Sequence, residues 1–128
     1  MFKIFNINAL VADDFAEVRL VLCTYLQELG CKTYEAENGE QILEWLDKRK
    51  FNILFTDLEM PVMNGVDACE YIRNSLMISS DDMKIVAVTS DRDEKIEKWL
   101  KKIGVDQILY KPFDDEVVTE LLHLYFHK

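Results

Sequence analysis

Residues 51–65 read FNILFTDLEMPVMNG, and this stretch decides which fold the sequence predicts. Its apolar beginning ends at Thr56 and Asp57, and a proline and a glycine then break the pattern. A short run of aromatic and β-branched residues closed by turn residues is typical of a buried strand in a parallel sheet. Asp57 should therefore lie at the carboxyl end of that strand, where open α/β sheets bind their ligands.

Strand-like and amphipathic segments alternate along the rest of the chain. The other strand segments are residues 7–12, 31–36, 84–89 and 107–110, and residues 31–36 alternate enough to form an edge strand. The helical segments are residues 15–29, 40–49, 64–76, 91–103 and a last one that begins after Asp114. Five strands alternating with five helices predict a doubly wound parallel α/β sheet with right-handed crossovers.

Each helical segment has an apolar stripe that should face the sheet. Asn64 and Asp114 are suitable helix N-caps, and Gly30 and Gly104 are suitable helix stops. The stripes are formed by Phe15, Val18, Leu22, Leu26 and Leu29; by Ile42, Leu43 and Leu46; by Val66, Cys69 and Ile72; by Ile96, Trp99, Leu100 and Ile103; and by Val117, Val118, Leu121, Leu122 and Tyr125.

The composition predicts one acidic domain that spans residues 1–128. Asp and Glu outnumber Lys and Arg by 24 to 15, and a net charge of −9 disfavours direct binding of nucleic acid. We expect neither a membrane span, which needs ~20 apolar residues, nor a secretory leader. Cys23, Cys31 and Cys69 lack CxxC spacing, which favours reduced, buried thiols in a cytoplasmic protein.

Charged or hydroxyl-bearing residues stand at the carboxyl ends of four predicted strands. They are Asp13 and Asp14 after the first, Asp57 on the third, Thr89 on the fourth and Lys111 after the fifth. Each has an ordinary explanation by itself, because aspartate caps helices, threonine favours strands and lysine is usually a surface residue. Together they should converge, since the carboxyl ends of parallel strands share one edge of the sheet.

Such a cluster is suited to phosphoryl transfer. Carboxylates about 4 Å apart repel each other by roughly 4 kcal/mol per pair at an effective dielectric near 20, so a cation is needed. Mg²⁺ favours one or two carboxylates, water and a phosphate oxygen. Lys111 adds a mobile positive charge, Thr89 adds a hydroxyl donor, and Asp57 is then the nucleophile that forms an aspartyl-phosphate.

The chain resembles the receiver domain of two-component response regulators over nearly its whole length. The resemblance rests on Asp13-Asp14, the run D-x-x-M-P-x-M-N-G from Asp57 to Gly65, Thr89-Ser90, and Lys111-Pro112-Phe113. It implies a flavodoxin-like fold with strand order 2-1-3-4-5. It also implies that Asp57 receives phosphate from a histidine kinase or a histidine phosphotransfer domain, and that the protein is a signalling switch rather than a turnover enzyme.

The resemblance further implies a role for each site residue. Lys111 would contact the phosphoryl group, and its peptide bond to Pro112 would be cis. Thr89 would move to hydrogen-bond the phosphate and trigger the switch, while the small Ser90 leaves access open. The Mg²⁺ ligands would be Asp14, Asp57 and the backbone carbonyl of Glu59, with Asp13 acting either directly or through a water molecule.

One position departs from the family pattern. Receiver domains usually carry a tyrosine or phenylalanine three residues before the lysine, as the rotating partner of the threonine. That position is Ile108 here, and the aromatic residue is Tyr110, directly before Lys111. Strand alternation puts Ile108 and Tyr110 on the same side, so Tyr110 is a candidate substitute in the switch.

The resemblance places the output surface on the last two helices and the strand between them. Leu124, Tyr125 and Phe126 are candidate contact residues there, although for Leu124 and Tyr125 we favour the interpretation that they complete the core. His123 and His127 are spaced as metal ligands could be, but a zinc site needs three or four ligands and no cysteine is near. We therefore interpret this histidine pair as surface residues.

Two other functions are compatible with parts of the pattern. A receiver-like module could bind partners without phosphate, and the isoleucine at position 108 is its only support. A haloacid-dehalogenase-type phosphohydrolase also uses an aspartate nucleophile, Mg²⁺, a Thr or Ser, and a Lys, and Glu59 matches its second acid. In that family, however, the nucleophile lies on the first strand and the acidic pair follows it.

Overall fold

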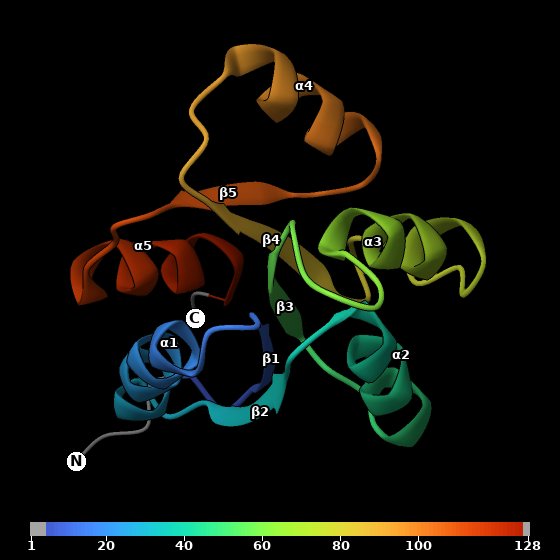
Figure 1. The fold of residues 1–128 in the computed structure, drawn as a ribbon. Coiled ribbons are helices and arrows are strands. Elements are labelled where there is room, and N and C mark those ends of the chain that lie inside the picture. Colours follow the sequence, from blue (N-terminus) through green and yellow to red (C-terminus); the bar gives the residue numbers. More distant parts are fainter. Residues whose placement is uncertain (1–4, 127–128) are drawn as a thin grey trace.

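The computed structural model describes residues 5–126, which form a five-stranded parallel sheet covered by helices on both faces (Figure 1). The strand order is β2-β1-β3-β4-β5. From β1, the chain therefore adds β2 on one side and then β3, β4 and β5 on the other. All neighbouring strands are parallel. The predicted doubly wound, flavodoxin-like architecture is confirmed.

The elements follow the predicted order. The strands are β1 (Asn8–Ala12), β2 (Lys32–Ala36), β3 (Ile53–Asp57), β4 (Lys84–Thr89) and β5 (Gln107–Tyr110). The helices are α1 (Ala16–Glu28), α2 (Gly39–Lys48), α3 (Gly65–Asn74), α4 (Glu94–Lys102) and α5 (Asp115–Phe126). Both predicted caps form: the Asn64 side chain accepts from the Asp67 amide at 2.8 Å, and the Asp114 side chain accepts from the Val117 amide at 2.9 Å.

Two apolar cores lie on opposite faces of the sheet. Helices α1 and α5 cover one core, and α2, α3 and α4 cover the other (Figure 1). Alternate residues of β3 divide between them, with Ile53 and Phe55 in the first and Leu54 in the second. This alternation follows from strand geometry, because successive side chains point to opposite faces. The sheet's carboxyl edge is thus held between two packed layers.

Four apolar residues assigned to the core are at the surface instead. Phe15 is 61% exposed because it is the N-cap residue of α1 and precedes the helical stripe. Trp99 on α4 is 46% exposed, and Val117 and Leu124 on α5 are 44% and 61% exposed. Their helical positions lie at the borders of the buried stripes, where the neighbouring helix does not reach them. Tyr125, by contrast, does pack against the core.

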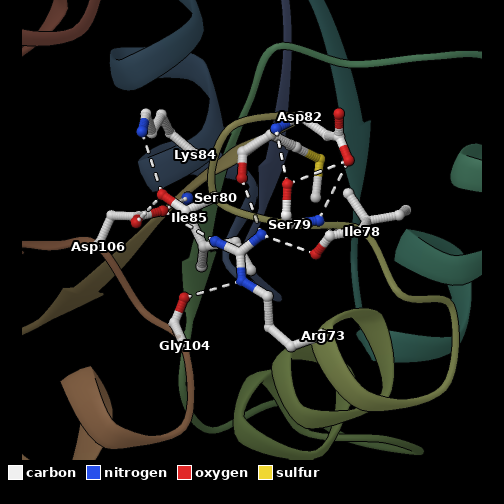
Figure 2. A network of polar contacts seen from close by, with 10 residues as sticks. Arg73, Ile78, Ser79, Ser80, Asp82, Lys84, Ile85, Gly104 and Asp106 are labelled. Carbon is white, nitrogen blue, oxygen red and sulfur yellow. Dashed lines mark hydrogen bonds and ion pairs between the residues drawn. The ribbon is translucent and has the colours of Figure 1, made fainter.

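An ion pair lies at the amino-terminal ends of β4 and β5, the sheet edge opposite to the one that carries Asp57 (Figure 2). Arg73 Nη2 lies 2.8 Å from Asp106 Oδ2, and other Arg73 nitrogens donate to the carbonyl oxygens of Gly104, Ile78 and Met83. Asp106 also accepts from the backbone N–H of Ile85 at 2.8 Å and from the Ser80 hydroxyl. This network fixes the loop between α3 and β4 onto the start of β5.

The remaining sequence expectations concern thiols, histidines and membrane spans. All three cysteines are buried and free, and burial raises the pKa of Cys69 to about 12, which keeps that thiol protonated. The exposed His123 stacks edge-on against Phe5, while His127 lies outside the described residues. No helix within residues 5–126 has the length and apolar character that crossing a membrane requires.

Candidate functional site

Three aspartates meet at the carboxyl edge of the sheet, as predicted. Asp13 and Asp14 directly follow β1, and Asp57 is the last residue of the adjacent strand β3. One carboxylate oxygen from each lies within 4.8 Å of the other two. Asp13 is only 2% exposed, whereas Asp14 is exposed and Asp57 is half-buried. Hard oxygen atoms gathered this closely, with one side open to solvent, fit a divalent cation such as Mg²⁺.

Lys111 brings a positive charge to the same cluster from β5. Its Nζ lies 3.2 Å from Asp13 Oδ2 and 4.0 Å from Asp57 Oδ1. The Lys111-Pro112 peptide bond is cis, as the resemblance implied. The ammonium group therefore lies between a buried carboxylate and the carboxylate at the end of β3.

The loop after β3 holds Asp57 at the cluster. The Leu58 amide donates to Asp57 Oδ1 at 2.8 Å, and the Gly65 amide donates to the Leu58 carbonyl at 3.0 Å. A Cβ at Gly65 would overlap the Asp57 carbonyl oxygen, so this position requires glycine. Exposed Glu59 follows in the same loop and lines the cleft beside Asp57.

The pKa of Asp57 is raised above its usual value. Burial is the main cause, the Lys111 ammonium acts in the opposite direction, and the neighbouring Asp13 carboxylate adds to the increase. The ionised form is thus less favoured than in an ordinary aspartate, and added positive charge would favour it. A bound divalent cation would supply that charge.

Thr89 lies where β4 ends and lines the same cleft. Its Oγ1 accepts a hydrogen bond from the Asp91 amide at 3.1 Å. The hydroxyl oxygen is therefore tied to the loop that leads into α4, and a movement of Thr89 would pull on that loop. Ser90 lies beside it, on the cleft wall.

Tyr110 connects β5 to α4 through a polar contact. Ile108, on the same strand, has no polar side-chain atom and cannot do so. Ile108 is partly buried against the core beneath α2, α3 and α4. Tyr110 Oη donates to Glu97 Oε2 at 2.8 Å, and the Arg92 guanidinium lies 4.5 Å from the centre of the Tyr110 ring. The pKa of Tyr110 is raised, and the hydrogen bond to Glu97 is the largest cause.

Sequence reasoning missed the partners of these residues. Glu97 lies 3.7 Å from Lys101, four residues later on α4, and it also accepts the hydrogen bond from Tyr110. Arg19 was unassigned, and its Nη1 donates to the Asp13 carbonyl at 2.6 Å. No spacing rule links Glu97 to Tyr110, because their contact depends on how α4 packs over β5. The only available signal was that both residues flank predicted site elements.

The site lies in an open cleft of about 900 Å³. The cleft contains Asp14, Asp57, Thr89 and Lys111, so four of the five predicted strand-end residues share one space. Asp13 is buried beside the cleft, and its carboxylate lies 3.2 Å from Lys111 Nζ and within 4.8 Å of an Asp57 carboxylate oxygen. The cleft continues between the first turn of α3 and helix α4, where Val66, Ile96 and Trp99 line it.

Comparison with known proteins agrees with this arrangement. Residues 9–123 match the response regulator receiver domain family. The chemotaxis protein CheY of Pseudomonas aeruginosa is 31% identical over 120 residues, which cover 93% of this chain and 95% of that protein.

Two solved structures share the fold. Chemotaxis response regulator CheY4 of Vibrio cholerae superposes with a TM-score of 0.85 at 24% identity, covering 95% of this chain and 100% of that chain. The receiver domain of Ssk1, solved with the Saccharomyces cerevisiae histidine phosphotransfer protein Ypd1, has a TM-score of 0.83 at 22% identity over 94% of this chain and 88% of that chain. The chain belongs to the response regulator receiver domain family, whose members are signalling proteins of two-component systems rather than turnover enzymes.

Proposed function

We propose that this protein is a phosphorylation-controlled switch in which Asp57 accepts a phosphoryl group. The observation that carries the proposal is the position of Lys111 Nζ, 3.2 Å from Asp13 and 4.0 Å from Asp57, at the convergence of three aspartates. An ion pair that only stabilised the fold would need one carboxylate beside Lys111. It would need neither the two further aspartates nor the open cleft. The whole chain, residues 1–128, acts in this proposal as one cytoplasmic receiver domain.

The proposed reaction uses a phosphohistidine of a kinase or a histidine phosphotransfer domain as donor. An Asp57 carboxylate oxygen attacks the phosphorus, the new O–P bond forms as the P–N bond breaks, and the imidazole nitrogen leaves with the electron pair. Lys111 then pairs with a phosphoryl oxygen. The Thr89 hydroxyl donates a hydrogen bond to another phosphoryl oxygen. Both groups favour the transferred state electrostatically.

The acidic residues fit Mg²⁺, which would offset the negative charge of the acceptor and the phosphoryl oxygens. Asp13, Asp14, Asp57 and the backbone carbonyl of Glu59 would hold the ion. Supporting observations are the 4.8 Å spacing of the carboxylate oxygens and the raised pKa of Asp57. The exposed Asp14 leaves room for water ligands, which Mg²⁺ usually retains.

The switch is proposed to run from Thr89 to Tyr110 and α4. If Thr89 turns toward the phosphoryl group, its bond to the Asp91 amide is lost and the loop that carries Arg92 shifts. Arg92 stacks on Tyr110, and Tyr110 binds Glu97 of α4, so the shift would reach that helix. Tyr110 thus replaces the aromatic residue that is absent at position 108.

The proposed output is binding of a downstream protein or an in-chain effector by the face formed by α4, β5 and α5. Val117 and Leu124 on α5 are exposed apolar residues that support this choice. A receiver-like module that binds without phosphate has the same surface, and it predicts binding that phosphorylation does not change.

Acetyl phosphate with Mg²⁺ provides the test, and intact-protein mass spectrometry provides the readout. We expect one phosphoryl group per chain, none on Asp57→Asn, and normal labelling of Asp47→Asn, a matched control at an exposed position of α2. Labelling that persists in Asp57→Asn would overturn the assignment. Repeated turnover of p-nitrophenyl phosphate would instead favour the phosphohydrolase.

A further inference from the structure

The chain's two tryptophans have different environments, because Trp45 is half-buried and Trp99 is exposed. Trp45 on α2 packs edge-on against the rings of Tyr34 and Phe51, and its indole N–H donates to the Glu35 carbonyl at 2.8 Å. Trp99 on α4 is 46% exposed and belongs to neither apolar core among the described residues. The exposed part of the Trp99 indole is apolar surface that a binding partner could bury.

Trp99 lines the extension of the open cleft between α3 and α4. We call this extension the α3–α4 groove and define it by Val66, Glu70, Ile96 and Trp99. Val66 and Ile96 are half-buried and pack on the core, so they form an apolar floor, while Trp99 rises beside it. The groove joins the acceptor site but lies on the α3 side of α4, whereas the α4–β5–α5 face lies on its other side.

The α3 wall of the groove and its end nearest the acceptor site are acidic, whereas the exposed Lys95 and Lys102 flank Trp99 on α4. Asp67 and Glu70 of α3 line one wall, and Asp91 and Glu59 line the part nearest the acceptor site. Lys111 is the one cation among the cleft-lining residues, and it is already paired with Asp13 and Asp57. An apolar floor beside an acidic α3 wall complements a segment that carries lysine or arginine on one side of an apolar side chain.

We propose that the α3–α4 groove is a docking site for a basic amphipathic segment of a partner protein. The segment's apolar side chain packs between Val66, Ile96 and Trp99, and its cations face Asp67 and Glu70. A second copy of this chain is a poor occupant, because each copy carries a net charge of −9. The proposal does not depend on phosphorylation of Asp57.

The test uses unphosphorylated protein and a synthetic peptide of about twelve residues, with leucines at helical spacing between lysines. Its matched control has every lysine replaced by glutamate. A Trp45→Phe background leaves Trp99 as the single tryptophan, so its fluorescence reports directly on the groove. If that background unfolds, the indole N–H resonance of Trp99 in the wild-type protein supplies the same information.

We expect the basic peptide to shift Trp99 emission to shorter wavelength and the acidic peptide to leave it unchanged. Trp99→Ala, followed by amide chemical shifts, should weaken binding about tenfold or more, as loss of a central aromatic contact does. Asp67→Asn with Glu70→Gln should weaken binding several-fold and reduce its dependence on salt. Leu124→Ser, an exposed apolar residue on α5, should bind normally.

Three results would overturn the proposal. The first is equal binding of the basic peptide to wild type and Trp99→Ala. The second is binding that stays unchanged at about 0.5 M salt, where surface charges are strongly screened. The third is a blue shift of Trp99 that grows with protein concentration in the absence of peptide, which would make a second copy the occupant. None of these results bears on phosphorylation of Asp57, which acetyl phosphate labelling tests separately.

Discussion

The Tyr110 hydroxyl donates a 2.8 Å hydrogen bond to the Glu97 carboxylate and so joins the last strand to helix α4. The aromatic ring stands one residue before the site lysine and lies under the Arg92 guanidinium. This contact gives the chain a connection between the carboxyl edge of the sheet and α4, although position 108 is an isoleucine.

Tyr110→Phe should separate phosphorylation from the response of α4. The variant keeps the ring beneath Arg92 and removes only the hydroxyl, so labelling of Asp57 by acetyl phosphate should be unchanged. The amide shifts of α4 on phosphorylation should become smaller, and stability should fall by about 1 kcal/mol or less, as for one partly exposed hydrogen bond. Glu97→Gln should act similarly, whereas Lys101→Gln, which breaks only the 3.7 Å surface pair, should not.

The Tyr110 phenol should ionise at higher pH than an ordinary tyrosine. Its pKa is raised by the hydrogen bond to Glu97, then by burial and by the charge of the same carboxylate. The folded state therefore holds the proton after the unfolded chain has lost it, so this group's contribution to stability declines as pH rises above about 10. Resolved ring resonances would follow the titration, and Glu97→Gln should lower the midpoint. An unchanged midpoint would contradict the link.

Asp57→Asn should stabilise the metal-free domain at neutral pH. The raised pKa of Asp57 means that the folded state binds this proton more tightly than the unfolded chain. The unfavourable contribution therefore grows as pH rises from about 4 through the folded pKa and is absent below that window. We expect a gain of up to about 1 kcal/mol in urea unfolding at pH 7, and little difference at pH 3. Asp47→Asn provides the surface control.

Mg²⁺ should raise the melting temperature of the wild-type protein. A ligand that binds only the folded state stabilises it by about 1.4 kcal/mol at ten times its dissociation constant. Asp57→Asn and Asp14→Asn should lose most of this gain, because each removes one of the three converging carboxylates. A wild-type melting curve that millimolar Mg²⁺ leaves unchanged would refute the metal assignment.

Asp106→Asn should destabilise the fold while leaving the acceptor chemistry intact. Asp106 pairs with Arg73 at 2.8 Å, and the side chains are 15% and 10% exposed. Removing the charge leaves a largely buried guanidinium without its counter-ion, which typically costs about 3 kcal/mol or more. Urea unfolding measures the loss, and labelling of the folded variant with acetyl phosphate should match wild type. Asp82→Asn, at the exposed end of the same loop, should change stability little.

The order and type of the elements could be predicted from local pattern. Buried strands such as Ile53–Asp57 are recognisable from composition, and helix caps such as Asn64 mark where the next element begins. Parallel strands joined by helices share a carboxyl edge, and Asp13, Asp57, Thr89 and Lys111 were therefore expected to meet. The structure brings them together as expected.

Residues at the borders of helices were harder to predict. Phe15 and Trp99 fit an apolar stripe by spacing, yet both are exposed, because burial depends on which neighbouring element covers that side of the helix. Periodicity alone carries no information about that neighbour. Periodicity also could not predict that Tyr110 binds Glu97 or that Arg73 pairs with Asp106, because the partners lie on different elements that meet only when the chain folds.

The sequence by itself determined the fold and the residues at the strand ends, because strand and helix periods and chain connectivity are local properties, and its short motifs carried the resemblance to the family. The tertiary structure alone decided that Tyr110 binds Glu97, that Arg73 pairs with Asp106, and that Trp99 borders an acidic groove. Those contacts depend on how helices pack against the sheet, and packing is set by the summed burial of many side chains rather than by any short motif.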